Sequence, residues 1–387
     1  MTIVIFDILD MLDLLLLSRP RTDFSSNYYE SRARTDRRSI ISQIRFPSHG
    51  FGQTVDRSVR AARATGPVAR RFLTGPARSS VHFDIPLRGP GGEPVDLLRT
   101  LTSHGLASLP PLEIDEERVT LTHTLAVPRG RPRTIRVSPG ARGRARVDVL
   151  GRSPGRGTLE ALLAGVHHVL HMDEDLSVFY ELTAADPDLS WVARGAGRMI
   201  RSPSVFEEVV RIVCTTNCSW AATTRMLTTL VQGLGERTSE APSDSWRGRA
   251  FPNPEAMAAV GERFYREEMR AGYRGPYLLS LARSVAEGTL DLEALGHAGR
   301  EELSDDEMEA RLLALPGVGP YAAAHIMLLL GRYSRLILDS WTRPKYARLR
   351  ASRRQVSDAS IVRRFRRYGE YSGLAFWCYL TRDWVND

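Results

Sequence analysis

The residues whose types and spacing best suit chemistry are two glycines and an aspartate. The glycines stand in the stretch Leu315-Pro316-Gly317-Val318-Gly319-Pro320-Tyr321, and Asp339 follows twenty residues after the second of them. Glycines let two helices join through a tight hairpin, and the N–H groups at the start of the second helix can point at one anion. The stretch therefore predicts an anion-binding hairpin with a carboxylate at a fixed remove along the chain.

The composition indicates which anion such a hairpin would hold. The chain carries a formal charge of +8 with a pI near 9.7, and basic side chains gain affinity for phosphates by releasing counterions. We therefore expect contacts to the backbone of double-stranded DNA at Gly317, Val318, Gly319 and Tyr321. Two alternatives stay open, because similar hairpins occur in non-catalytic nucleic-acid binders and a Gly-Val-Gly turn can be merely structural.

The hairpin followed by Asp339 resembles the HhH-GPD superfamily of DNA base-excision glycosylases, in which a second helix and a connecting loop end in an essential aspartate. The resemblance implies that Asp339 opposes the positive charge that develops on the sugar as the base leaves, and helps orient the attacking water. A carboxylate about 4 Å from that charge contributes on the order of 4 kcal/mol, or roughly a thousandfold in rate. A role for Asp339 as the N-cap of a helix beginning at Ser340 is compatible with catalysis.

The position of lysine separates two kinds of chemistry within the superfamily. Members that also cleave the DNA backbone carry a lysine two residues after the second hairpin glycine, where this chain has Tyr321. The only lysine is Lys345, so the resemblance implies a monofunctional enzyme that uses water. The alternatives are a catalytically silent protein that binds lesions through the hairpin, and a bifunctional glycosylase/lyase.

Two upstream segments resemble the 8-oxoguanine glycosylase branch within a likeness that spans roughly Phe83 to Trp384. They are Val213-Cys214-Thr215-Thr216-Asn217-Cys218 and Ala271-Gly272-Tyr273-Arg274-Gly275-Pro276-Tyr277. The resemblance implies that Asn217 fills the space left by the flipped base, Tyr273 wedges the duplex open and Arg274 contacts the orphaned partner base. A base cannot be excised inside a stacked duplex, so these roles are physically sensible.

The substrate pocket departs from that branch. Phe376 stands where the 8-oxoguanine enzymes place a base-reading glutamine, and Leu380 stands where they stack an aromatic ring. A pocket lined by Tyr321, His325, Phe376 and Trp377, with Trp220 as a further candidate, resembles the alkyl-purine branch instead, because electron-poor alkylated bases stack well on aromatic rings. Each of these side chains could alternatively be a core residue.

The sequence implies no organic or metal cofactor. Cys214, Cys218 and Cys378 are too few for a disulfide framework or a four-cysteine iron–sulfur cluster, and we expect Cys214 and Cys218 to be packing residues one helical turn apart. A monovalent cation held by hairpin carbonyls is compatible with the resemblance. We expect a monomeric, reduced, cytoplasmic protein that is nucleoid-associated if bacterial, and whose partner is double-stranded DNA containing a damaged base.

The chain divides into three parts by composition. Residues 1–80 are rich in Arg and Ser, with an apolar run at 3–17 that is too short and acidic to span a membrane, and we expect a disordered arm. A DNA-binding arm, a transit peptide and a dispensable tail remain open interpretations of it. Residues 81–185 predict an α+β module, and residues 186–387 predict an all-helical glycosylase domain. The expected fold class is α+β.

Periodicity and capping signals place the elements. Alternation predicts strands at 81–87, 118–128, 133–138 and 144–150, with helices at 94–104 and 158–171. Ser204-x-x-Glu207, Ser304-x-x-Glu307 and Asn253-Pro254 indicate helix starts. The helices expected after residue 186 cover 204–215, 219–234, 254–260, 261–270, 274–287, 305–315, 320–331, 340–349, 358–368 and 371–382.

Overall fold

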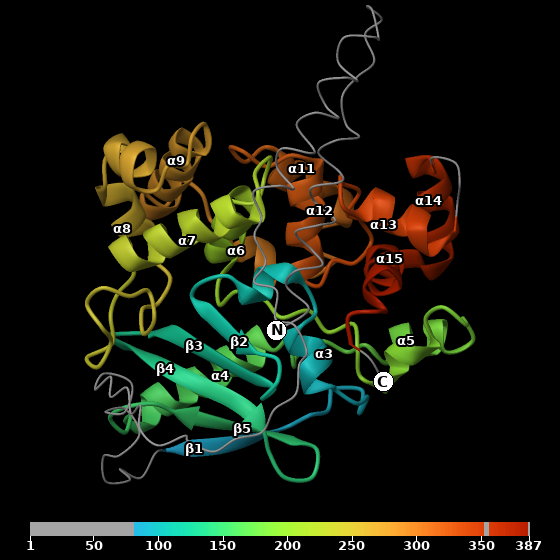
Figure 1. Cartoon of the computed structure of the whole chain (residues 1–387), viewed down its shortest axis with the longest axis horizontal. Helices are drawn as coiled ribbons and strands as arrows, with labels where there is room; N and C mark the ends of the chain where they lie inside the picture. Colours follow the sequence, from blue (N-terminus) through green and yellow to red (C-terminus); the bar gives the residue numbers. More distant parts are fainter. Residues whose placement is uncertain (1–80, 352–355, 386–387) are drawn as a thin grey trace, which may run out of the picture. The chain divides into compact units, whose positions relative to one another are not determined.

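A computed structural model describes residues 81–351 and 356–385, shown in Figure 1. These residues belong to one compact unit that spans Ala77–Asp387. The predicted disordered arm at 1–80, including the apolar run at 3–17, lies outside the described residues.

The N-terminal part of the described chain forms a five-stranded antiparallel sheet. Its strands are β1 (His82–Pro86), β2 (Leu112–Asp115), β3 (Thr120–Val127), β4 (Gly130–Pro139) and β5 (Arg144–Val149), in the spatial order β1-β5-β4-β3-β2. Alternation along the strands sends Ile135, Val137 and Val147 to one face, where they share a core with Leu162 and Val166 of helix α4 (Arg156–Val169). Figure 1 shows α4 behind the sheet. The predicted sheet module is confirmed, with β2 as an unforeseen edge strand.

Helices make up the rest of the described chain. The regular ones are α3 (Leu97–Leu101), α5 (Ser177–Ala184), α6 (Val205–Val213), α7 (Trp220–Leu234), α8 (Pro254–Ala259), α9 (Arg274–Ala286), α10 (Glu293–His297), α11 (Asp305–Leu313), α12 (Pro320–Leu329), α13 (Thr342–Leu349), α14 (Asp358–Phe365) and α15 (Ser372–Thr381). Short 3-10 turns lie at Gly105–Ser108, Ser190–Arg194 and Arg366–Tyr371, and a π-helical turn lies at Phe264–Glu268.

The helix starts follow the predicted caps. The Ser204 hydroxyl accepts the Glu207 N–H at 3.2 Å, and Ser304 and Glu307 form a reciprocal capping box. Asn253 accepts the Ala256 N–H at 2.8 Å, with proline at the first helical position of α8. These caps satisfy backbone donors that would otherwise lack partners, and so they fix where each helix begins.

Two hydrogen-bonded side chains join the sheet part to the helices. Arg211 of α6 is 2% exposed and donates to the carbonyl oxygens of Leu106 and Leu109. The Trp377 indole of α15 donates to the Ser103 carbonyl at 2.8 Å. Leu106 also packs in the helical core, so residues on both sides of the predicted boundary at 185/186 contribute to that core.

The helical core surrounds α12, whose residues Ala322 to Leu329 are all buried. Cys214 and Cys378 lie in this core, with Cys218 packed against it, which confirms the packing role expected for Cys214 and Cys218. Among the described residues, no helix is long and apolar enough to cross a bilayer.

Candidate active site

The two hairpin glycines between α11 and α12 play different parts. Gly317 has φ +81°, and a Cβ there would lie 3.0 Å from Cδ2 of Tyr277 and 3.3 Å from Cγ1 of Val213. The turn therefore requires glycine at this position. Gly319 has an ordinary φ of −104°, and a Cβ there would meet no atom within 4 Å. The fold itself does not require glycine at position 319. The absence of a side chain there leaves open space beside the start of α12.

The start of α12 carries unpaired backbone donors. Gly319 is its N-cap and Pro320 its first residue, and no side chain caps it. Within the described part of the chain, the N–H groups of Gly319, Tyr321 and Ala322 have no hydrogen-bond partner. Such a helix start favours an anion.

Val318 does not share in this anion site. Its side chain is 7% exposed and belongs to the core, and its N–H donates to the Leu315 carbonyl at 3.2 Å. The expectation that Val318 contacts the DNA backbone is therefore corrected, because the turn already uses its donor.

Asp339 is half-buried and uses one carboxylate oxygen as a helix cap. Its Oδ1 accepts the N–H of Trp341 at 2.9 Å and of Thr342 at 2.7 Å, and its own N–H donates to Thr342 Oγ1 at 2.8 Å. Asp339 thus holds backbone donors at the start of α13, but this helix begins at Thr342 with Trp341 as its N-cap, rather than at Ser340 with Asp339 as its N-cap as predicted. No donor among the described residues bonds to Oδ2.

Tyr321 lies beside Asp339. Its hydroxyl is 3.3 Å from Thr215 Oγ1. Burial raises the pKa of Tyr321 to about 12; the Thr215 hydrogen bond works the other way, and the charge of Asp339 raises it further. The phenol is therefore neutral at physiological pH, and the carboxylate is near enough to act on it electrostatically.

Aromatic rings continue from Tyr321 toward α15. The His325 ring centroid lies 5.7 Å from that of Tyr321 and 5.7 Å from that of Trp377, and Trp341 lies 5.8 Å from Trp377. Burial, followed by the charge of His104, lowers the pKa of His325 to about 3, so its ring is neutral. We call Tyr321, His325, Trp341 and Trp377 the aromatic cluster. The sequence reasoning missed Trp341, although its place two residues after Asp339 was a usable signal.

Phe376 does not join the aromatic cluster. It is 1% exposed and packs 5.2 Å from the Phe365 ring centroid and 6.1 Å from that of Tyr346. Neighbouring residues of a helix point about 100° apart, so Phe376 and Trp377 face different surroundings. Its predicted place in the base pocket is corrected to a place in the core. Trp220, at the start of α7, is 42% exposed and makes no ring contact with the described residues.

The predicted wedge residues come together at the surface. Asn217 adopts the left-handed conformation with φ +45°, and its Nδ2 lies 3.4 Å from the hydroxyl of Tyr273, which is 51% exposed. Arg274 is buried: its guanidinium lies 4.5 Å from the Tyr273 ring centroid and donates to the carbonyls of Thr216 and Ala271. Arg274 thus packs against Tyr273 and does not present its guanidinium at the surface, which corrects its expected contact with the orphaned base.

Tyr277 connects the wedge residues to the hairpin. Its ring centroid lies 6.1 Å from that of Tyr273, and its side chain lies against the backbone of Gly317. It is largely exposed on α9.

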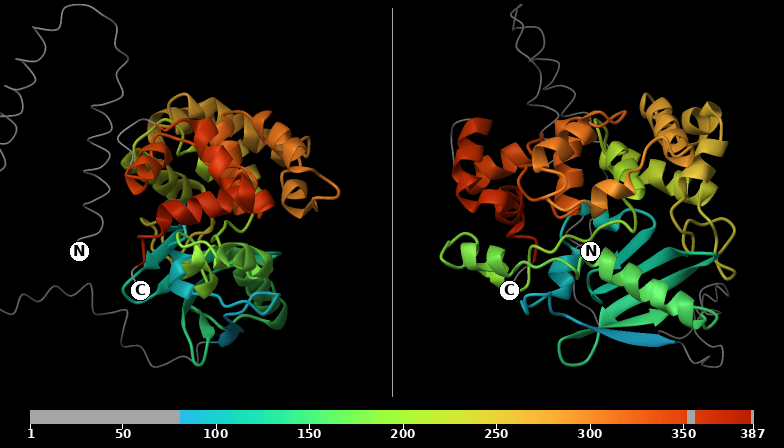
Figure 2. Two further views of the ribbon diagram at one scale, coloured as in Figure 1. Left: turned by 90° about the vertical axis from the view of Figure 1, so that its right-hand side faces the viewer. Right: turned by 180° about the vertical axis from the view of Figure 1, so that it is seen from behind.

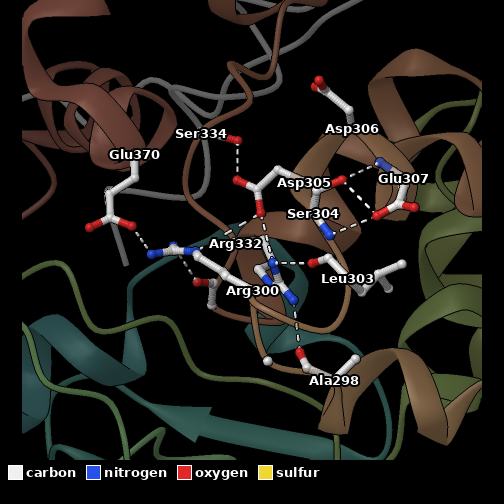
Figure 3. Close-up of polar contacts among 12 residues, drawn as sticks. Ala298, Arg300, Leu303, Ser304, Asp305, Asp306, Glu307, Arg332, Ser334 and Glu370 are labelled. Atoms are coloured by element: carbon white, nitrogen blue, oxygen red, sulfur yellow. Dashed lines mark hydrogen bonds and ion pairs between the residues drawn. The ribbon is translucent and has the colours of Figure 1, made fainter.

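A buried arginine, Arg332, lies on the segment that leads from α12 to Asp339, and Figure 3 shows its polar contacts. Arg332 donates to the carbonyls of Leu303 and Ala298 at 2.9 and 2.7 Å, and to Asp305 Oδ1 at 2.9 Å. Ser334 donates to the other oxygen of Asp305. Burial works to raise the pKa of Asp305, but the hydrogen bonds from Ser334 and Arg332 outweigh it and lower that pKa. The segment is thereby tied to the start of α11.

Lys345 forms an ion pair, and the His, Cys, Asp and Glu side chains of the described residues form no group that could bind a metal. The Lys345 ammonium, on α13, is 2.6 Å from a carboxylate oxygen of Asp383. Over residues 81–351 and 356–385, no three His, Cys, Asp or Glu side chains gather in a group that could hold a metal ion.

Comparisons with known proteins agree with this architecture. No protein-family model matches the chain. A DNA-3-methyladenine glycosylase of Bacillus subtilis is 25% identical over 179 residues, which are 45% of this chain and 55% of that protein. The chain thus spans about half the length of this relative.

Solved structures are similar over more of the chain. A 3-methyladenine DNA-glycosylase from Archaeoglobus fulgidus matches with a TM-score of 0.59 and 20% identity, over 79% of this chain and 99% of that one. The apo 8-oxoguanine glycosylase/lyase of Clostridium acetobutylicum matches with a TM-score of 0.57 and 21% identity, over 75% and 93% of the two chains. The resemblance to DNA glycosylases read from the sequence is therefore confirmed at the level of the fold, which the chain shares with these solved structures.

Proposed function

We propose that this protein is a DNA glycosylase that removes a damaged purine in base excision repair. The observation that carries the proposal is Asp339, whose Oδ2 has no donor among the described residues and whose charge acts on Tyr321, a member of the aromatic cluster. A negative charge at such a place suits a reaction in which positive charge develops on the substrate.

The hairpin, the wedge residues and Asp339 each act in one step of the proposed reaction. A DNA phosphate binds the free N–H groups of Gly319 and Tyr321. Asn217 and Tyr273 fill the gap left when the damaged nucleotide turns out of the duplex. The free oxygen of Asp339 then stabilises the cationic sugar as the glycosidic bond breaks. Water adds its oxygen to the sugar carbon, and the base leaves with a proton.

The chemistry that we propose is hydrolysis without strand cleavage. Tyr321 occupies the position where a lyase would need a lysine, and its pKa of about 12 keeps it a neutral phenol. Lys345 is ion-paired with Asp383. Borohydride reduction during turnover should therefore trap no covalent protein–DNA adduct, and a trapped adduct would instead identify a bifunctional enzyme.

We propose alkylated purines as the lesions that this protein removes. Tyr321, Trp341 and Trp377 offer ring faces on which an electron-poor base can stack. Residue 376, the place of a base-reading glutamine in the branch that this chain resembles, is a buried phenylalanine. The Bacillus subtilis relative, named for 3-methyladenine, supports the same choice.

A panel of duplexes, each with one defined damaged base, tests the proposal. Base release is scored by alkali-induced strand cleavage, with undamaged duplex as the control. We expect release of alkylated purines ahead of 8-oxoguanine. Release from no lesion would favour the second candidate, a non-catalytic helix-hairpin-helix protein that binds lesions, because the capping role of Asp339 Oδ1 alone accounts for an aspartate at this position.

A further inference from the structure

The positive charge of the described chain is not concentrated on the helices that carry the hairpin. Residues 157–387 contain 28 basic and 30 acidic residues, whereas residues 129–156 contain nine arginines and only one acidic residue, Asp148. The basic character that pointed to DNA therefore resides, within the described residues, mainly on β4, β5 and the segments that flank them. The proposed active site does not account for it.

Arg136 and Arg146 lie on the sheet surface that faces away from α4, and the other arginines lie toward the two ends of β4 and β5, where Arg131 and Arg133 share the alternation of Ile135. Val137 and Val147 point into the sheet core, so the alternate residues Arg136 and Arg146 lie on the opposite face. Figures 1 and 2 show α4 on only one side of the sheet. No helix of the described residues packs on the face that carries Arg136.

Five of these arginines have no side-chain partner among the described residues. We call Arg129, Arg131, Arg136, Arg142 and Arg152 the arginine stripe; all five are exposed, and no hydrogen bond or ion pair joins their side chains to the described residues. By contrast, Arg146 pairs with Asp148 at 3.0 Å. Acidic side chains collect at the β2 edge, in a hollow that Arg136 also lines. Glu113 and Asp115 are paired there with Arg247 and Arg118, whereas Glu116 and Glu117 form no ion pair with the described residues.

The strand register gives the arginine stripe its length. Ile135 of β4 pairs with Val149 of β5, and Pro139 pairs with Ala145. Arg152 therefore lies toward the Arg131 end of the ribbon, and Arg142 lies at the other end. Ten residues of β4 at about 3.3 Å each span roughly 33 Å, which is close to one turn of duplex DNA at about 3.4 Å per base pair.

We propose that the arginine stripe is a second DNA-binding surface, which takes the phosphate backbone of duplex DNA without regard to sequence. Unpaired guanidinium groups already exposed to water gain by replacing the counterions of phosphates. The arginine stripe lies on the sheet, whereas the hairpin lies between α11 and α12 in the helical part (Figures 1 and 2). The protein can thus hold undamaged duplex on one surface while the other engages a lesion.

A matched pair of full-length variants tests this surface. The stripe variant carries Arg131→Gln, Arg136→Gln and Arg142→Gln. The control variant loses the same charge from ion-paired arginines of the same region, through Arg118→Gln, Arg156→Gln and Arg247→Gln. The dissociation constant for undamaged duplex is measured across a salt series, and thermal unfolding checks that both variants fold.

The stripe variant should bind about tenfold more weakly near 100 mM salt, and its plot of log affinity against log salt should be shallower by about one unit per lost phosphate contact. The control should keep the wild-type slope. An unchanged slope in the stripe variant, or an equal loss in both variants, overturns the proposal. So does a stripe variant that loses binding to polyglutamate but not to DNA, since it would identify an acidic protein as the partner.

Base release separates this inference from the proposed catalytic function. Single-turnover release from a short lesion duplex, at saturating protein, should be the same for wild type and stripe variant. A large fall in that rate would show that the surface is not separate from the active site. If no form of the protein releases a damaged base, the proposed catalytic function is wrong. The salt dependence of binding then still tests whether the arginine stripe binds DNA.

Discussion

At the scale of single residues, the two carboxylate oxygens of Asp339 have different hydrogen-bond partners. Oδ1 caps α13 through the N–H groups of Trp341 and Thr342, and Oδ2 has no donor among the described residues. An amide side chain can reproduce the capping acceptor but carries no charge. Substituting Asp339 by asparagine or by alanine therefore separates its contribution to stability from its proposed contribution to catalysis.

Capping predicts how those two variants differ in stability. Asp339→Ala should lower the free energy of unfolding by about 1 kcal/mol, because two backbone donors of α13 lose their acceptor, whereas Asp339→Asn should cost only a few tenths. Urea denaturation followed by circular dichroism measures both. Equal stability of the two variants would show that the cap contributes nothing.

The buried His325 predicts a loss of stability in acid. Its pKa is lowered to about 3 in the folded protein by burial, against about 6.5 in the unfolded chain. The unfolded state thus binds the proton that the folded state excludes, so the contribution of His325 to the free energy of unfolding is constant above about pH 6.5 and falls as pH drops below it. Replacing His325 by phenylalanine should reduce the loss between pH 7.5 and 5.5 by about 1.4 kcal/mol. The same loss in both proteins would contradict this account.

At the scale of elements, the hairpin glycines predict opposite outcomes. Gly319→Ala should leave thermal stability unchanged, since a Cβ there meets open space, but should weaken binding to every duplex sequence by crowding the phosphate. Gly317→Ala should instead destabilise the fold, because its φ is +81° and its Cβ would crowd Tyr277. Fluorescence anisotropy with unrelated duplexes, alongside thermal unfolding, distinguishes the two. Unchanged affinity in Gly319→Ala would remove the anion-binding argument.

Elements with strong local signals were predictable and those without were not. The capping box at Ser304 and the proline after Asn253 marked helix starts that the structure confirms. Strand β2 has only four residues and helix α10 only five, too few for periodicity to show. Phe376 and Trp377 were equally aromatic in sequence, and only the packing of α15 decided which one joined Tyr321 and His325.

At the scale of the whole described unit, the sheet and the helices are joined by buried polar contacts that sequence reasoning could not foresee. Arg211 of α6 reaches the carbonyls of Leu106 and Leu109, about one hundred residues earlier in the chain. Such pairings depend on tertiary approach rather than on local pattern. The resemblance to a superfamily predicted the fold, but not the residues that join its parts.

Those contacts predict that sheet and helices unfold together. Arg211→Met should lower the free energy of unfolding by about 3 kcal/mol, because carbonyl acceptors lose a buried charged donor. Wild-type tryptophan fluorescence, which reports mainly on the helices, and far-ultraviolet circular dichroism should give coincident transitions. Separate transitions in the wild type would show that the parts fold independently.

The central claim is that Asp339 acts chemically, and the rate of base release by Asp339→Asn tests it most directly. The experiment compares wild type and variant on a duplex with one alkylated purine, at saturating protein. Thermal unfolding and DNA-binding measurements first establish that the two proteins have the same stability and DNA affinity. Loss of a carboxylate about 4 Å from the cationic sugar predicts a fall of roughly a thousandfold. A variant that releases the base at the wild-type rate would contradict the account.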